Sequence, residues 1–118
     1  MISREACAAE AAELRAVPGV RRVLFSRPDG VAHYDDAALE ERELGAASVA
    51  VLVGATDHAA HSFGLGRAEG VIVYGSGVQL IARPVNDLLM VVVADLEAAG
   101  HDVYRRVRAA GRRLDALA

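Results

Sequence analysis

The sequence has no tryptophan, no lysine and a single cysteine. Cys7 alone permits no internal disulfide. Aromatic residues make up only 4% of the chain, which is few for lining the cavity of a small-molecule sensor domain. No apolar run approaches the roughly 20 residues of a membrane span, and no basic segment followed by an apolar stretch opens the sequence. We therefore expect a cytoplasmic protein without a membrane span.

The charge balance is slightly acidic. The 13 basic and 16 acidic residues give a formal net charge of −3 at pH 7 and a pI of about 5.8. This balance argues against nucleic acid as the main partner. At 118 residues, with 53% hydrophobic and 25% charged residues, the chain has the composition of one globular domain spanning residues 1–118, with a single core.

Hydrophobic periodicity and turn residues predict three helices and five strands. Ser3 can cap a first helix that ends near Val17, with Cys7, Ala11 and Leu14 on its buried stripe. The elements expected after it are strands 20–26 and 31–34, a long helix 39–63, strands 69–74, 78–84 and 88–94, and a last helix 101–117. The apolar stripe of this last helix comprises Val103, Val107, Ala110, Leu114 and Leu117.

Turn sequences and one strongly apolar segment predict the sheet. Residues 27–30 and 75–77 are typical hairpin turns, so neighbouring strands should be antiparallel. The segment 88–94 is apolar at every position, which indicates an interior strand covered on both faces. An interior fifth strand joins the two hairpins in the order 2-1-5-4-3. We predict an α+β fold, α-β-β-α-β-β-β-α, with the central helix on one face and the terminal helices on the other.

The long helix is apolar on nearly all sides. On a helical wheel, one arc suits packing on the sheet and comprises Val49, Leu52, Val53, Ala60 and Phe63. The opposite arc is also small or apolar and comprises Leu44, Ala47, Ala50, Val51, Gly54 and Ala55. A chain with one core cannot cover both arcs, so the second arc needs another surface. We interpret the chain as a protein that works by docking.

The strand at residues 69–74 should lie at a sheet edge, and it has no proline or lysine to discourage pairing. Pairing of this edge with a second copy about a two-fold axis would also bring the two long helices together. We therefore predict a homodimer. The predicted dimer-interface residues are Ala50, Gly54, Glu69, Val71, Ile72, Val73 and Tyr74.

At this point the sequence resembles the Roadblock (dynein light chain) domain family, and most closely its short bacterial members. The resemblance rests on Val17-Pro18-Gly19-Val20-Arg21, Pro28-Asp29-Gly30-Val31 and His61-Ser62-Phe63-Gly64-Leu65-Gly66, followed by the three hydrophobic strands. Each motif alone is common, and their joint order and spacing from about Ala6 to Leu117 make the match. One departure is that residues 95–100 lack the family's asparagine-leucine-glycine stretch.

The resemblance implies a homodimer with a continuous sheet that binds Ras-like small GTPases. Some bacterial members act as GTPase-activating partners, and others belong to signalling operons with a sensor kinase and a GTPase. The chain would then be a non-enzymatic regulator that modulates GTP hydrolysis or the signalling state. We assign GTPase contact to residues of the outer arc and its fringe: Glu40, Glu43, Ala47, Val51, His58 and His61.

Other interpretations stay open. The small residues of the outer arc could pack on the second copy's helix without touching a GTPase. The protein could be a structural dimerisation scaffold in a signalling complex, without effect on nucleotide turnover. A small-molecule sensor domain is a further alternative.

Three features could be mistaken for chemistry. His58 and His61 are spaced as metal ligands beside Asp57, but they lack a third ligand in sequence reach. Gly64-Leu65-Gly66 leaves a helix and enters a strand, which is the reverse of a phosphate loop. Cys7 has no base placed near it and should be a small buried hydrophobe. We expect no catalytic, cofactor or metal site.

The last helix carries a basic run of Arg105, Arg106, Arg108, Arg112 and Arg113. Most of these arginines are explained as a solvent-exposed flank that complements the helix dipole. Binding of an acidic partner is the more specific but less favoured interpretation. Arg67 is the only candidate for an arginine finger, and the family resemblance does not favour that role.

Overall fold

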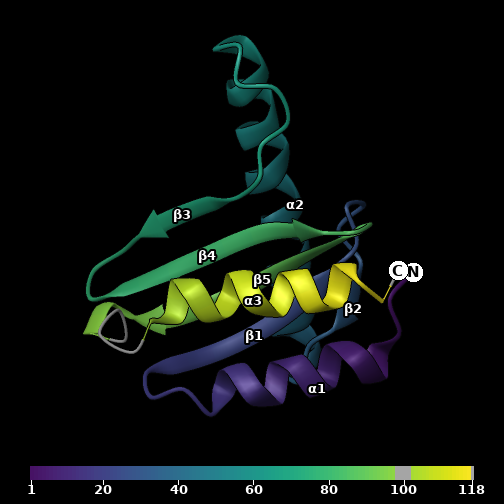
Figure 1. Ribbon diagram of the computed structural model, residues 1–118, viewed down its shortest axis with the longest axis vertical. Helices are drawn as coiled ribbons and strands as arrows, with labels where there is room; N and C mark the ends of the chain where they lie inside the picture. Colours follow the sequence, from purple (N-terminus) through teal and green to yellow (C-terminus); the bar gives the residue numbers. More distant parts are fainter. Residues whose placement is uncertain (98–101, 118) are drawn as a thin grey trace.

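An antiparallel sheet with helices on both faces makes up the protein (Figure 1). The computed structural model describes residues 1–97 and 102–117. The elements are α1 (Arg4–Arg15), β1 (Val20–Ser26), β2 (Ala32–Tyr34), α2 (Leu39–Ser62), β3 (Val71–Tyr74), β4 (Val78–Val85), β5 (Leu88–Asp95) and α3 (Val103–Asp115). This order confirms the predicted α-β-β-α-β-β-β-α arrangement.

The sheet has five strands in the order β2-β1-β5-β4-β3, as predicted. The central strand β5 pairs antiparallel with β1 on one side and with β4 on the other, so that Val91 lies between Leu24 and Ala82. All three of these residues are buried. The uninterrupted apolar sequence of β5 therefore corresponds to a strand covered on both faces.

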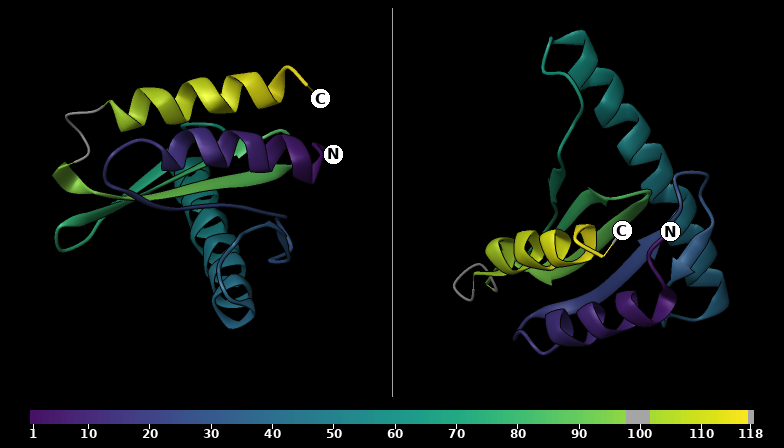
Figure 2. Two further views of the ribbon diagram at one scale, coloured as in Figure 1. Left: turned by 90° about the horizontal axis from the view of Figure 1, so that it is seen from below. Right: turned by 45° about the vertical axis from the view of Figure 1, so that its right-hand side comes forward.

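The helices form two layers. Figure 2 shows α1 and α3 side by side on one face of the sheet, with α2 on the opposite face. Between the sheet and α1 and α3 lies the larger core, which includes Phe25, Met90 and Leu114. Between the sheet and α2 lies a smaller core built around Leu24, Val49 and Val91. The predicted division of helices between the faces is confirmed.

Local chemistry explains the ends of the terminal helices. The Ser3 hydroxyl accepts a hydrogen bond from the Ala6 amide at 3.1 Å and so caps α1. The start predicted for α3, at residue 101, lies outside the described residues, and so do residues 98–100 of the departure from the Roadblock pattern. The placement of Leu117 on the buried stripe of α3 was wrong. Leu117 is 67% exposed because the helix ends at Asp115.

The first hairpin closes at the predicted turn. The Arg27 amide donates to the Val31 carbonyl oxygen at 2.8 Å, and Gly30 has a φ of +87°, a backbone conformation that glycine adopts without strain. Strand β3 begins at Val71, two residues later than predicted. Glu69, expected in the strand, lies instead in the loop returning from α2, because pairing with β4 begins only at Val71.

Helix α2 is longer than the sheet that it covers. Figure 1 and the right-hand view of Figure 2 show its C-terminal end and the following loop reaching well beyond the strands. The placement of Phe63 on the sheet-facing arc was therefore wrong. Its side chain is 82% exposed, because the sheet does not extend to this end of the helix. Within α2 only Ala46, Val49 and Ala60 are buried.

Candidate partner-binding surface

Solvent-exposed hydrophobic side chains are concentrated on α2, on the loop after it and on β3. Eleven large hydrophobic residues are exposed in the described part of the chain, and seven of them lie between residues 39 and 74. These seven are Leu39, Leu44, Val51, Phe63, Leu65, Val73 and Tyr74. Scattered exposed hydrophobic residues are normal, but a concentration of this kind makes these residues a candidate interaction surface.

The six residues predicted to contact a GTPase are all exposed on α2: Glu40, Glu43, Ala47, Val51, His58 and His61. At 100° per residue they fall within roughly 80° of the helical wheel, opposite the buried Val49. Val51, at the middle of this stripe, is 74% exposed. The geometry thus gathers the predicted residues on one outward stripe, hereafter the outer stripe of α2.

The residues predicted for the dimer interface do not all lie in the same environment. Gly54 is exposed, and a Cβ atom there would meet no other group within 4 Å. Ala50 is half-buried, because the turn between β1 and β2 covers it. A Cβ atom on Gly30 of that turn would lie 3.7 Å from the Ala50 Cβ atom. Ala50 is thus already covered in part by its own chain.

Strand β3 presents a free edge. It pairs with β4, and its other side pairs with no strand in the described residues. Val71 packs on the core beneath α2 and Ile72 on the core beneath α3. Since side chains alternate along a strand, Val73 lies on the α2 face and Tyr74 on the α3 face, where both are exposed.

A hollow of about 240 Å³ lies beside α2, near the β1–β2 turn. Ala50 and Gly54 line it from the helix, and Pro28, Asn86 and Asp87 line it from the two hairpin turns. Sequence reasoning missed the hairpin residues, because their proximity to α2 depends on long-range folding. No local signal in the sequence could have placed them there.

The projecting end of α2 is covered mainly by its own return loop. The Leu65 amide donates to the Ala60 carbonyl oxygen at 2.8 Å, which turns the chain back along the helix. An open groove of about 610 Å³ remains between helix and loop, lined by Thr56, Ala59, Ala60, Phe63, Leu65 and residues 67–70. This apolar end of the helix has no core of its own to pack on.

Solved structures with the same arrangement exist. MglB from Myxococcus xanthus superposes with a TM-score of 0.86 at 17% identity, over 97% of this chain and 88% of that one. The gliding protein MglB from Thermus thermophilus superposes with a TM-score of 0.84 at 22% identity, over 98% of this chain and 90% of that one. A Roadblock/LC7 domain from Streptomyces avermitilis superposes with a TM-score of 0.80 at 17% identity, over 90% of this chain and 92% of that one. The chain has the Roadblock/LC7 fold. Searches of protein-family models and of curated proteins return no match.

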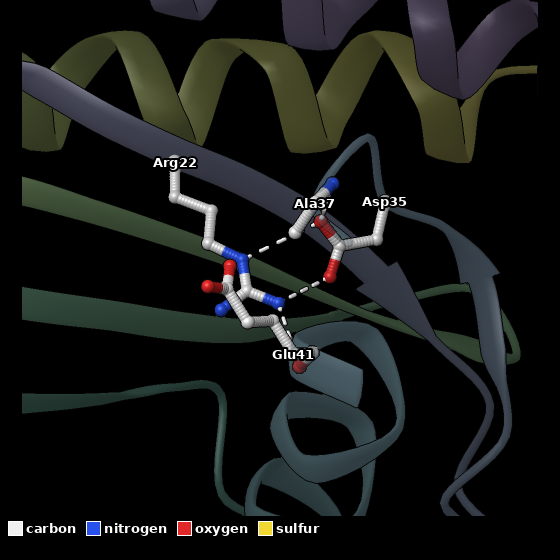
Figure 3. Close-up of polar contacts among 4 residues, drawn as sticks. All are labelled: Arg22, Asp35, Ala37 and Glu41. Atoms are coloured by element: carbon white, nitrogen blue, oxygen red, sulfur yellow. Dashed lines mark hydrogen bonds and ion pairs between the residues drawn. The ribbon is translucent and has the colours of Figure 1, made fainter. Parts of the chain in front are cut away.

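Within this Roadblock/LC7 fold, an ion pair fastens the first turns of α2 to the sheet (Figure 3). The Arg22 Nη2 atom in β1 lies 2.5 Å from Asp35 Oδ2 and donates to the Glu41 carbonyl oxygen at 3.1 Å. The Asp35 Oδ1 atom accepts from the Ala37 amide at 3.1 Å. The Asp35 carboxylate is buried and binds Arg22.

Gly45 makes room for this ion pair. A Cβ atom at this position would lie 2.9 Å from Arg22 Nη2, closer than real Cβ contacts. Glycine weakens a helix interior by about 1 kcal/mol relative to alanine, so its presence in α2 calls for a local reason. The passage of the Arg22 side chain supplies that reason. The orientation of the outer stripe therefore depends on Arg22, Asp35 and Gly45.

No group of three or more histidine, cysteine, aspartate or glutamate side chains within residues 1–97 and 102–117 is arranged to hold a metal ion. In the same residues no helix is long and apolar enough to cross a membrane. Burial raises the pKa of the Cys7 thiol to about 11, so the reactive thiolate is disfavoured at neutral pH.

Proposed function

We propose that this protein is a homodimeric regulator that binds a Ras-like small GTPase and modulates its GTP hydrolysis or signalling state. The observation that carries the proposal is the outer stripe of α2 on a Roadblock/LC7 fold, where the exposed Ala47 and Val51 lie among the exposed glutamates and histidines of the same stripe. The overlap of that fold with MglB structures supports it. The family resemblance of the sequence points to the same class of partner.

Dimerisation through the β3 edge would bury surface that a single copy leaves in water. Burying side chains such as Leu44, Phe63 and Leu65 is worth about 1.5–3 kcal/mol each, or about 5–9 kcal/mol for the three. Association costs about 4–15 kcal/mol in lost freedom of motion. The helix surfaces alone therefore barely offset this cost. Pairing of β3 with β3 of the second copy adds the backbone hydrogen bonds that make the dimer stable.

A regulator of this type needs little chemistry of its own. GTP hydrolysis depends on positioning the attacking water and on stabilising charge at the transferring phosphoryl group. A protein that binds one arrangement of the switch segments more tightly raises the population of that arrangement. The outer stripe of α2 offers Ala47 and Val51 for close contact, with Glu43 and His61 at its fringe.

The test is GTP turnover by a Ras-like GTPase from the same genome, with and without the purified protein. Acceleration supports an activator, and binding without acceleration supports a scaffold. No association with any GTP-binding protein contradicts both. Glu43→Lys should weaken binding, because it reverses a charge beside the outer stripe. Glu5→Lys is the control, since Glu5 is exposed in α1 on the other face of the sheet. Equal binding of the GTPase by both variants would show that Glu43 is not part of the binding site.

A further inference from the structure

The arginines of this chain fall into two groups. Six make ion pairs: Arg15 with Asp36, Arg21 with Asp95, Arg22 with Asp35, Arg27 with Asp29, Arg105 with Asp102 and Arg113 with Glu10. Arg106 also has a partner. Within the described residues, the six without an acidic partner are Arg4, Arg42, Arg67, Arg83, Arg108 and Arg112. The unpaired arginines are not scattered, because four of these six line one groove.

This groove lies between α3 and strands β3 and β4 and has a volume of about 810 Å³. Its arginines are Arg67, Arg83, Arg108 and Arg112. Glu69 is the single acidic residue in its lining. Apolar side chains, among them Ile72, Ile81 and Val107, also line it. The chain as a whole carries a net charge of −3, so this local positive excess does not follow from composition.

The side chain of Arg83 passes close to α3 at Gly111. A Cβ atom on Gly111 would lie 3.1 Å from Arg83 Nε, so a larger residue there would require the arginine side chain to shift by a few tenths of an ångström. Glycine is disfavoured inside a helix, as at Gly45. The Arg83 Nε atom is buried without a hydrogen-bond partner. A buried donor without a partner beside an open groove favours a polar ligand there.

The helix dipole does not account for this cluster. Of the four arginines, only Arg112 lies in the last turn of α3, where a basic residue complements the dipole. Arg108 lies one turn earlier with its guanidinium group 5.9 Å from the Tyr104 ring centroid, which fixes a cation on the groove wall. Arg67 and Arg83 come from other elements altogether.

We propose that this groove docks an acidic peptide segment of a partner protein, with carboxylates on the arginines and apolar side chains on the wall between them. The apolar lining and the size of the groove favour a peptide over a single phosphate group. The groove lies on the α3 face of the sheet, opposite α2. Peptide binding and GTPase binding therefore use different surfaces, and either one can fail alone. Val71 and Ile72 of the groove also belong to the predicted dimer interface, so the peptide would lie beside the second copy.

The experiment uses a fluorescein-labelled peptide of twelve residues with the repeat Glu-Glu-Leu, titrated against the full-length protein by fluorescence anisotropy. The glutamine counterpart of the peptide should not bind. Binding should weaken as ionic strength rises, because exposed charges are screened. Arg108→Gln with Arg112→Gln should weaken binding about tenfold, since two charge-assisted contacts are lost. Arg105→Gln is the control, because Arg105 lies on the same helix outside the groove.

A second variant tests the role of Arg83 without removing its charge. Gly111→Ala should displace the arginine and weaken peptide binding, with circular dichroism confirming that α3 still forms. No binding of the acidic peptide, equal binding of the glutamine peptide, or equal affinity in all variants would overturn the proposal. Preferential binding of inorganic phosphate or of phosphatidylserine vesicles would also overturn it. A changed sedimentation mass in the double variant would assign the groove to self-association instead.

Discussion

Replacement of Asp35 by alanine should loosen the attachment of α2 to the sheet. The Asp35 side chain is fully buried, whereas that of its partner Arg22 is 27% exposed. Removing one member of a fully buried ion pair costs about 3–5 kcal/mol. Because Arg22 reaches water in part, we expect a loss of about 2–3 kcal/mol in the free energy of unfolding. The Ala37 amide also loses its acceptor, which contributes to that loss.

Urea unfolding followed by circular dichroism measures this loss. Protein concentration must be the same for all variants, because self-association would make the apparent stability depend on it. Arg27→Ala is the matched control, since its pair with Asp29 is about half-exposed and should contribute less than about 1 kcal/mol. The double variant Arg22→Leu with Asp35→Leu should recover much of the loss, because neither charge then remains unpaired. A loss below about 0.5 kcal/mol for Asp35→Ala, or a double variant that costs the sum of both single changes, would refute the reasoning.

Three further predictions concern single positions. Gly45→Ala should destabilise the protein by about 1 kcal/mol in urea unfolding despite alanine's better helix propensity, because its Cβ atom would meet Arg22. A gain in stability would show that Gly45 is not needed to make room for the Arg22 side chain. Ser3→Ala should cost about 1 kcal/mol by removing the cap of α1, and an unchanged melting temperature would show that the cap is dispensable. Burial raises the pKa of Cys7 from 9.0 to about 11, so its contribution to the free energy of unfolding should be complete below pH 9 and should fall by about 3 kcal/mol as the pH rises past 11. The Cys7→Ala variant should lack this decline in stability. Parallel pH profiles of stability for the two proteins would disprove the prediction.

Much of the sheet could be predicted from local sequence. The bounds of β1 were predicted to the residue, and the uniformly apolar β5 identified the centre of the sheet. The end of α2 could not be predicted, because periodicity identifies a helix face but not the width of the sheet beneath it. Phe63 has the right phase to face the sheet, yet the sheet does not reach it.

The candidate surfaces also differ in how far the sequence alone could predict them. The outer stripe of α2 follows from helical phase, and its six residues are all exposed on one side of the helix. The Arg22–Asp35 pair and the arginine groove join residues far apart in the sequence, and composition alone cannot locate them. Gly45 and Gly111 were the available local signals. Each is a glycine inside a helix, placed where an arginine side chain crosses.

Sedimentation equilibrium tests most directly the claim that a second copy packs on the β3 edge and on α2 at Ala50 and Gly54. One chain has a mass of 12.4 kDa. We expect twice that mass for the wild-type protein at micromolar concentrations, and the mass of one chain for Val73→Asp, which places a charge on the free edge. A folded wild-type protein that sediments as a single chain at high concentration would contradict the account.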